Sequence, residues 1–401
     1  MIDLILKKGK ERSLLRRHPW VYDTAVGKLS GKAQSGDTVR VLSHDGRFLA
    51  WAAYSKDSTL RARCWSFGED DRIDAAWIEE KIQKALNARE SLFARTSAVR
   101  VIFGEADQLP GLVVDRYGDW YVTQFQAAGV EAFREVIADA LMKQPGIKGI
   151  FDRSDAATRH REGLAERVEV LRGPEPPQEI EVIEDGVRYG VDVRKGHKTG
   201  FYIDQRENRY LAQRLAREFK LRHGRGMRAL NCFCYTGGFS LALLAGGAEE
   251  VISVDSSADA LEMAAKNASR NGFDEKRAKW VQADVFEYLR QAREAGEVFD
   301  LVILDPPKFA SSHRHIDRAA RAYKDINLNG LRLVAPGGDL LTFSCSGAMD
   351  VDLFQKVIAG AVIDSKREAW MIARLGAGAD HPLMMTCPEG EYLKGLQLTL
   401  R

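Results

Sequence analysis

The sequence predicts an α/β protein whose last part is a parallel sheet with helices on both faces. From about residue 200 onward, apolar strands alternate with helices, which is typical of such a sheet. Residues 1–72 contain short β-like runs separated by turn residues, which predict a small β-rich domain. Residues 73–178 read as an α+β domain that ends in a proline-rich linker, so the third domain is expected over 179–401.

Length and composition are those of an ordinary globular protein. The chain has 401 residues, of which 45% are hydrophobic and 29% charged, and this is enough for two or three domains. No run of 18 apolar residues predicts a membrane span. The start, "MIDLILKKGK", is charged too early for a secretory signal, so we expect a cytoplasmic protein. No oligomerisation signal stands out, and we expect a monomer or a homodimer.

The cysteines do not predict a disulfide framework or a metal site. There are five, an odd number at scattered positions. Cys232 and Cys234 are separated by a single residue, and no histidine follows at zinc-finger spacing. We therefore expect no bound metal.

The first domain is strongly basic. Residues 1–68 hold 13 Lys/Arg against 6 Asp/Glu, a net charge of +7, whereas the whole chain carries only +2. This asymmetry favours a module for a polyanion, although a solvated basic surface would have the same composition. Aromatic residues are interleaved with the cations, as on RNA-binding surfaces. The predicted RNA-binding residues of this domain are Lys7, Lys8, Lys10, Arg12, Arg16 and Arg17.

The middle of the chain shows a helix over 73–95, strands at "VRVIFG", "GLVVDRYG" and "WYVTQFQ", a helix near 130–143 and a strand at "KGIFDRS". Spacing alone singles out no catalytic group there. Asp185-Gly186 lies between two alternating runs and predicts a β-hairpin with a two-residue turn.

Candidate ligand-binding groups follow successive strands of the last domain. The strands are "MRALNCF", "EVISVD", "KWVQAD", "FDLVILD" and "GDLLTFSC". Gly237 and Gly238 form the turn after the first strand, Asp255 ends the second, Asp284 follows the third, and "DPPKF" follows the fourth. Parallel sheets bind ligands at these carboxyl ends.

Two cofactors are considered for this edge of the sheet, a dinucleotide and S-adenosylmethionine. A dinucleotide fold would show G-x-G-x-x-G, which the first turn lacks. The full set of Gly237, Asp255, Asp284 and Asp305-Pro306 favours S-adenosylmethionine, with Asp255 on the ribose hydroxyls and Asp284 on the adenine amino group. Taken alone, Asp255 has a second interpretation as a helix N-cap.

Cys345 ends the last of these strands, in "LLTFSCSG". Position alone leaves two interpretations, a buried structural cysteine and a nucleophile beside Asp305.

Several motifs resemble one group of class I methyltransferases. They are "KGHKTGFYIDQRENR", "LNCFCYTGGFSLALLAGGA", "VISVDSS", "ILDPPKF", "YKDIN", "LLTFSCSG" and "EGEYLKG". Together they resemble the RNA 5-methylcytosine methyltransferases, and "RSLLRRHPWVY" resembles the PUA domain of that family, a small RNA-binding barrel. "GEADQLPGLVVDRYGD" and "FDRSD" resemble its central domain, so the resemblance covers almost the whole chain.

The resemblance implies a Rossmann-like domain that binds S-adenosylmethionine and a substrate in 23S ribosomal RNA. It implies Cys345 as the nucleophile that adds to C6 of cytosine, and Asp305 as a hydrogen-bonding partner of the base. Lys308 and Lys324 are candidates for holding phosphate or base. The implied cofactor-binding residues are Lys198, Thr199, Gly200, Phe201, Gln205, Arg206, Asn231, Tyr235, Thr236, Gly237, Gly238, Asp255, Ser256, Asp284, Val285, Asp305 and Pro306.

One position departs from many RNA cytosine-C5 methyltransferases. These carry a second cysteine after the first proline of "DPP", where this chain has Pro307, so another base must remove the C5 proton. Three of the implied cofactor-binding residues also have a structural interpretation. Phe201 could cover the adenosine of the cofactor or pack under the predicted hairpin. Gln205 and Arg206 could contact the cofactor or serve as the polar first residues of a helix.

Two other functions stay open at this point. Methylation of a purine N7 or amino group would need no thiol, and "DPP" followed by an aromatic residue is common in amino methyltransferases. A non-catalytic RNA-binding protein on the same fold is the second alternative.

Overall fold

The computed structural model describes residues 1–155, 157–310 and 313–401. The chain forms two compact units. The first comprises residues 1–184, 191–203 and 379–390, and the second comprises 185–190, 204–378 and 391–401. Segment 379–390 therefore belongs to the first unit, although its neighbours on both sides in sequence belong to the second. The three-domain division of the sequence stays a prediction.

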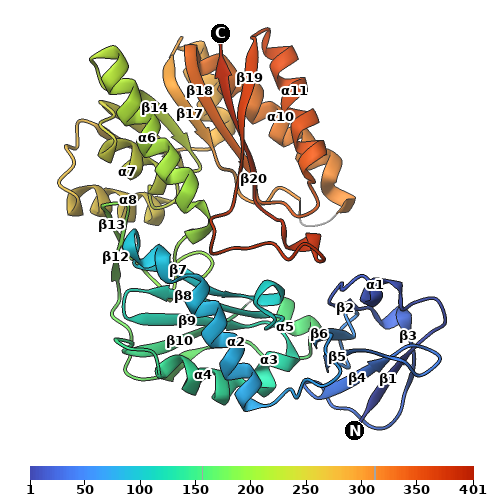
Figure 1. Ribbon diagram of the computed structural model, residues 1–401. Helices are drawn as coiled ribbons and strands as arrows, with labels where there is room; N and C mark the ends of the chain where they lie inside the picture. The colour runs from blue at the N-terminus through green and yellow to red at the C-terminus, as the bar shows by residue number, and fades with distance from the viewer. Residues whose placement is uncertain (156, 311–312) are drawn as a thin grey trace. The chain divides into compact units, whose positions relative to one another are not determined.

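The N-terminal part of the first unit is a six-stranded sheet with strand order β2-β6-β5-β4-β1-β3 (blue in Figure 1). Only β1 and β4 pair in parallel. Leu4, Val39 and Ala50 are fully buried in its core. The elements are β1 Asp3–Leu6, α1 Arg12–Leu15, β2 Trp20–Val21, β3 Val26–Leu29, β4 Thr38–Leu42, β5 Phe48–Tyr54 and β6 Ala62–Ser66.

The rest of the first unit is built on a five-stranded sheet of order β11-β10-β9-β8-β7. Strands β7 to β10 are almost wholly buried, and α2 packs on α4 beside them. The elements are α2 Ala75–Ala88, β7 Ala98–Phe103, β8 Leu112–Tyr117, β9 Trp120–Phe125, α3 Ala128–Ala132, α4 Arg134–Met142, β10 Gly149–Ser154, α5 Thr158–Arg161 and β11 Arg167–Arg172.

The helix predicted over 73–95 is shorter than expected. Asp74 caps α2 by accepting a hydrogen bond from the Trp77 backbone N–H at 3.1 Å, but the helix ends at Ala88. Beyond it, residues 90–94 form a 3-10 helix. The Arg89 guanidinium is buried at this break and donates to Asp107 at 2.6 and 2.8 Å.

The predicted hairpin is present. β12 Ile180–Glu184 and β13 Val187–Val191 pair across Asp185 and Gly186. These two residues have φ values of +47° and +83°, as a tight two-residue hairpin turn requires.

The second unit contains a seven-stranded sheet of order β16-β15-β14-β17-β18-β20-β19. The five predicted strands pair in parallel, and β20 is antiparallel to both of its neighbours. The sequence did not predict β19 and β20, and their antiparallel pairing makes the sheet mixed and not purely parallel. The strands are β14 Arg228–Cys232, β15 Glu250–Asp255, β16 Ala278–Gln282, β17 Phe299–Leu304, β18 Val334–Ser344, β19 Ala369–Gly376 and β20 Lys394–Leu400.

Helices cover both faces of this sheet, as the alternation of elements predicted. In Figure 1, α6, α7 and α8 lie to one side of it and α10 and α11 to the other. The helices are α6 Arg206–His223, α7 Gly238–Ala245, α8 Ala258–Arg270, α9 Val285–Glu294, α10 Ile316–Leu333 and α11 Val351–Ser365. Within the described part of the chain, no helix is both long and apolar enough to cross a bilayer.

Candidate active site

The turn between β14 and α7 is held in an unusual backbone conformation. Phe233, Tyr235 and Gly237 have φ values of +60°, +48° and +83°. A side chain at Gly237 would also meet the Trp280 ring at 3.0 Å, so glycine is required there on two grounds. Left-handed conformations at non-glycine residues cost free energy and concentrate at functional sites.

Asp255, at the end of β15, holds this turn in place. One carboxylate oxygen accepts a hydrogen bond from the Tyr235 N–H at 2.8 Å, and the other accepts from the Ser257 N–H at 3.0 Å. Asp255 does not cap the next helix, because Ser257 does so by accepting from the Ala260 N–H at 3.2 Å. The cap interpretation of Asp255 is therefore wrong, and its partly exposed carboxylate can accept further hydrogen bonds.

Asp284 follows β16 and is exposed. It caps α9 by accepting a hydrogen bond from the Glu287 N–H at 3.1 Å, and its neighbour Val285 is buried in the core. A carboxylate accepts several hydrogen bonds, so the predicted contact to an adenine amino group is compatible with this cap and stays a prediction.

The remaining groups of this turn differ in exposure. Asn231 is buried, and its side-chain N–H donates to the Ser240 hydroxyl at 2.8 Å, a partner within the fold. Tyr235, Thr236 and Gly238 are partly exposed, and Ser256 is exposed. The two carboxylates of Asp255 and Asp284 at adjacent strand ends suit the hydroxyl and amino donors of an adenosine, so the residues present fit S-adenosylmethionine.

Cys345 and the Asp305-Pro306 turn lie together. β17 and β18 are adjacent parallel strands, in register at Leu304 and Thr342, and each group directly follows the end of its strand. The Cys345 thiol lies 3.8 Å from the Pro306 carbonyl oxygen, close enough for a weak S–H donor. Asp305 is partly exposed, and Cys345 is the one cysteine that is not buried. All five cysteines are free thiols.

Two serines on either side of Cys345 are anchored by Tyr323 of α10. The Ser344 hydroxyl donates to the Tyr323 hydroxyl at 2.9 Å, and the Ser346 hydroxyl lies 3.1 Å from it. The Ala310 N–H also donates to Ser346, at 3.3 Å. Burial raises the pKa of Tyr323, which therefore stays protonated and neutral at ordinary pH. Tyr323 belongs to the motif "YKDIN", from which no role for it could be predicted.

The segment before α6 is divided between the two units. In the first unit, Thr199 is fully buried, donates to Asp115 at 2.5 Å and bonds the Tyr117 hydroxyl at 2.8 Å. Gly200 and Phe201 are buried as well, and the Lys198 ammonium lies 4.4 Å from the centre of the Tyr202 ring.

Gln205 and Arg206 belong to the second unit. Gln205 is the N-cap residue of α6, and its side-chain oxygen accepts from the Asn208 amide at 2.5 Å. Arg206 is the first residue of that helix and is fully buried. The helix-start interpretation of both residues thus holds, and a contact to the cofactor stays a prediction.

The predicted RNA-binding cations are all at least partly exposed. In the N-terminal part of the first unit, the exposed cations follow β1 or lie on or beside α1, and they are Lys7, Lys8, Lys10, Arg12, Arg16 and Arg17. Lys308 is exposed after the Asp305-Pro306 turn, whereas Lys324 forms an ion pair with Asp364 at 2.8 Å.

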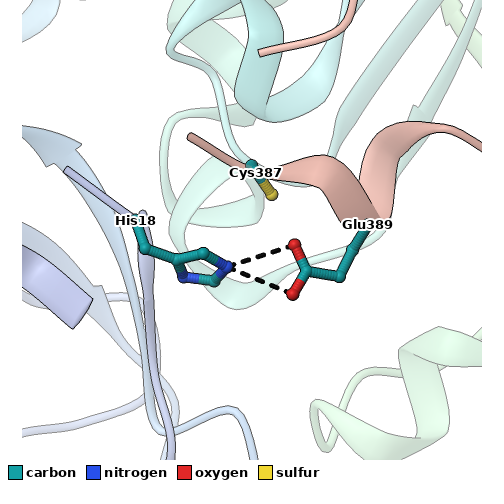
Figure 2. A group of neighbouring side chains, drawn as sticks. All are labelled: His18, Cys387 and Glu389. Atoms are coloured by element: carbon teal, nitrogen blue, oxygen red, sulfur yellow. Dashed lines mark hydrogen bonds and ion pairs between the residues drawn. The ribbon is translucent and has the colours of Figure 1, made fainter. Parts of the chain in front are cut away.

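One group of side chains has the composition of a metal site that the sequence did not predict. His18, Cys387 and Glu389 place one donor atom each within 4.8 Å of one another (Figure 2). The His18 Nε2 atom lies 3.1 Å from a Glu389 oxygen, so a hydrogen bond between their side chains already accounts for two of the three residues. The expected absence of a metal stays a prediction. These residues are far apart in sequence, so no spacing pattern could have revealed the group.

Comparison with known proteins defines the class first. Residues 121–363 match the family model of S-adenosylmethionine-dependent methyltransferases, and residues 4–67 match that of PUA-like domains. A solved structure of a proposed S-adenosylmethionine-dependent methyltransferase from Streptococcus mutans is 23% identical, with a TM-score of 0.83 and full coverage of both chains. This likeness supports the fold. The chain belongs to the S-adenosylmethionine-dependent methyltransferases, and S-adenosylmethionine is its cofactor.

Full-length relatives then give the particular family. Proteins named "Ribosomal RNA large subunit methyltransferase I" include one from Tolumonas auensis that is 46% identical, over 98% of this chain and 97% of the relative. The Aeromonas hydrophila protein of that name is 44% identical over 99% of both chains. The chain belongs to this family too, which confirms the α/β fold and the PUA-like N-terminal domain expected from the sequence.

Proposed function

We propose that the protein methylates C5 of a cytosine in 23S ribosomal RNA through a covalent bond between Cys345 and C6 of the base. The ribosomal substrate is inferred from the names of the relatives. The observation that carries the covalent mechanism is the placement of Cys345. It is the cysteine that is not buried, and it touches the turn that follows Asp305.

The reaction needs a nucleophile because C5 of cytosine is too weakly nucleophilic by itself. Attack of the Cys345 thiolate on C6 forms a carbon–sulfur bond and moves an electron pair toward C5. Asp305 hydrogen-bonds the base through N3 or the amino edge and helps protonate the adduct. S-adenosylmethionine supplies the methyl group that C5 acquires. A base then takes the C5 proton, the C5–C6 double bond re-forms and the thiolate leaves.

The residues that would hold the cofactor are Asp255, Asp284 and the turn at Gly237. The proton-removing base is not a second cysteine, because Pro307 occupies that position, and a water molecule would serve. The target base must leave its stack to reach Cys345, so a flipped or single-stranded cytosine is expected. The six exposed cations after β1 and around α1 would hold the surrounding phosphates, and the reaction would take place in the cytoplasm.

The test uses 23S ribosomal RNA that lacks the modification, radiolabelled S-adenosylmethionine and nucleoside analysis of the product. The wild-type protein should produce 5-methylcytosine at one position. Cys345→Ala should reduce the rate by at least about a thousandfold, because the activated nucleophile is gone, while cofactor affinity persists. Label on a purine, or full transfer by Cys345→Ala, would support purine methylation instead.

A further inference from the structure

Lys394 is a buried cation beside the turn that carries Cys345. It is the first residue of β20 and only 5% exposed. In the antiparallel pairing of β18 and β20, Lys394 lies opposite Ser344, the residue before Cys345. Lysine is seldom buried in proteins unless its charge has partners.

The Lys394 ammonium binds the backbone of that turn. It donates to the Ser346 carbonyl oxygen at 2.9 Å and to the Met349 carbonyl oxygen at 2.6 Å. The turn that carries Cys345 is thus held from β20 by Lys394 and from α10 by Tyr323, through its serines. Cys345 itself lies between these two anchored positions.

Carbonyl oxygens satisfy the hydrogen-bond donors of an ammonium but do not neutralise its charge. Burial lowers the pKa of Lys394, and the negative charges of Glu391, Cys345 and Asp350 act in the opposite direction. Lys308 is the nearby cation that lowers it further. Cys345 is thus among the groups whose ionised form interacts favourably with Lys394. Tyr323 also interacts with Cys345, and Asp305 directly precedes Pro306, whose carbonyl oxygen the thiol contacts.

We propose that Lys394 is a positioning residue for the methylation: it fixes the turn that carries Cys345, and its charge favours the thiolate form of that cysteine. The thiol proton leaves to solvent, and the buried ammonium and the partly exposed thiolate then carry opposite charges. This inference rests on the proposed function, in which the thiolate is the attacking group.

The first measurement is the rate at which iodoacetamide alkylates Cys345 as a function of pH, read by peptide mass spectrometry. It needs no RNA, so it reports on Lys394 even if the proposed function is wrong. Lys394→Gln keeps N–H donors for the two carbonyls but removes the charge. The alkylation profile of this variant should move upward by about 1 pH unit or more, because a neighbouring opposite charge is removed.

The second measurement is methyl transfer at neutral pH. A tenfold smaller thiolate fraction should lower kcat of Lys394→Gln by about tenfold, with KM for RNA and cofactor affinity unchanged. Lys394→Arg keeps the charge, so its alkylation profile and its kcat should both lie close to those of the wild type. The matched control is Lys356→Met on α11, an exposed lysine paired with Asp352 at 2.7 Å, which should change neither.

A purely structural role gives a different result. If Lys394→Gln binds the cofactor like the wild type and has an unshifted alkylation profile, the charge does not act on Cys345 and the inference is overturned. Loss of activity in Lys394→Gln and Lys394→Arg alike, with the profile unshifted, overturns it as well. Failure of the proposed function appears separately, as methyl transfer by Cys345→Ala.

Discussion

At the scale of single residues, the carboxylates after β15 and β16 show what the sequence could and could not predict. Asp255 and Asp284 look alike in sequence, since each follows a strand and precedes a helix. In the structure, Asp284 caps its helix, whereas Asp255 is replaced in that role by Ser257 two residues later. Local residue preferences cannot tell which residue caps the helix after each strand, because this depends on how far the strand extends before the chain turns.

This difference makes Asp255 the sharper test of the cofactor site. Asp255→Ala removes the acceptor for Tyr235 and Ser257 and the proposed acceptor for the ribose. We expect at least about a tenfold weaker affinity for S-adenosylmethionine, the effect of removing a charge-assisted hydrogen bond. Isothermal titration calorimetry measures it.

The matched control is Asp259→Ala, an exposed carboxylate in the first turn of α8. It should leave the affinity unchanged. Equal affinities in Asp255→Ala and the wild type, with both proteins folded by circular dichroism, would remove Asp255 from the site.

At the scale of elements, local patterns predicted the buried parallel strands and failed for β19 and β20. β17 is buried at every position and apolar except for Asp300, and a short run of this kind is typical of a buried parallel strand. β19 has several exposed apolar side chains, among them Trp370 and Ile372, and lacks a clear alternation. Its place is set by antiparallel pairing with β20, from which a long connection separates it in sequence.

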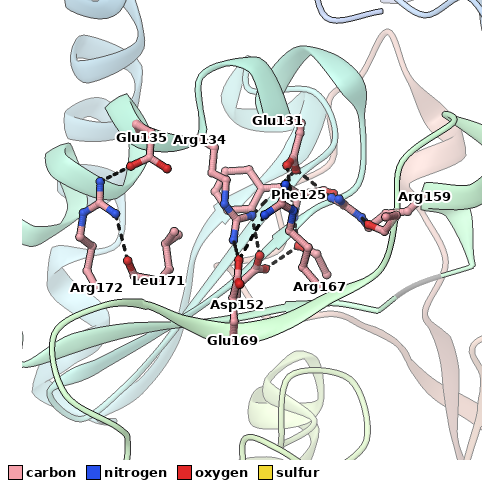
Figure 3. Close-up of polar contacts among 12 residues, drawn as sticks. Phe125, Glu131, Arg134, Glu135, Asp152, Arg159, Arg167, Glu169, Leu171 and Arg172 are labelled. Atoms are coloured by element: carbon pink, nitrogen blue, oxygen red, sulfur yellow. Dashed lines mark hydrogen bonds and ion pairs between the residues drawn. The ribbon is translucent and has the colours of Figure 1, made fainter.

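The five-stranded sheet of the first unit has another feature with no local sequence signal, a network of charged side chains around β10 in which Arg134, Asp152 and Arg159 are buried. Arg134 bridges Asp152 at 2.5 Å and Glu169 at 2.7 Å, and Arg159 contacts Glu131 at 2.9 Å (Figure 3). Burial raises the pKa of Asp152 despite the hydrogen bonds that it accepts. Buried charges require partners, and here they come from several separate elements.

The basic N-terminal sheet leads to a prediction at this scale. Arg12, Arg16 and Arg17 lie on or just after α1 and are exposed. Changing all three to Gln should weaken RNA binding and flatten its dependence on salt. The slope of log affinity against log salt should fall by about 0.7–0.9 for each phosphate that the protein no longer neutralises. Filter binding over a range of salt concentrations measures both.

A control for charge alone changes Arg214, Arg217 and Arg222, three exposed arginines of α6, to Gln. This variant should keep the wild-type slope. If the two triple variants behave alike, the N-terminal sheet has no special role in binding RNA.

At the scale of the whole molecule, the order of motifs predicted the fold class and cofactor, but not how the chain is divided between its units. Segment 379–390 leaves the second unit between β19 and β20 and joins the first, where Asp380 is fully buried and accepts from the Arg100 N–H at 3.0 Å. Lys394 lies four residues beyond this segment. A segment that packs in the other unit is placed by tertiary contacts, and its sequence shows no periodic pattern that would predict this.

The central claim is that the protein forms a covalent bond to its RNA through Cys345. The direct test uses RNA with 5-fluorocytosine at the target position, together with S-adenosylmethionine. Fluorine at C5 cannot leave as a proton does, so the adduct should accumulate and resist denaturation. Mass spectrometry should find the nucleotide on the peptide that contains Cys345, and Cys345→Ala should give no adduct. Methyl transfer to normal RNA without any trapped adduct, or an adduct on another residue, would contradict the mechanism.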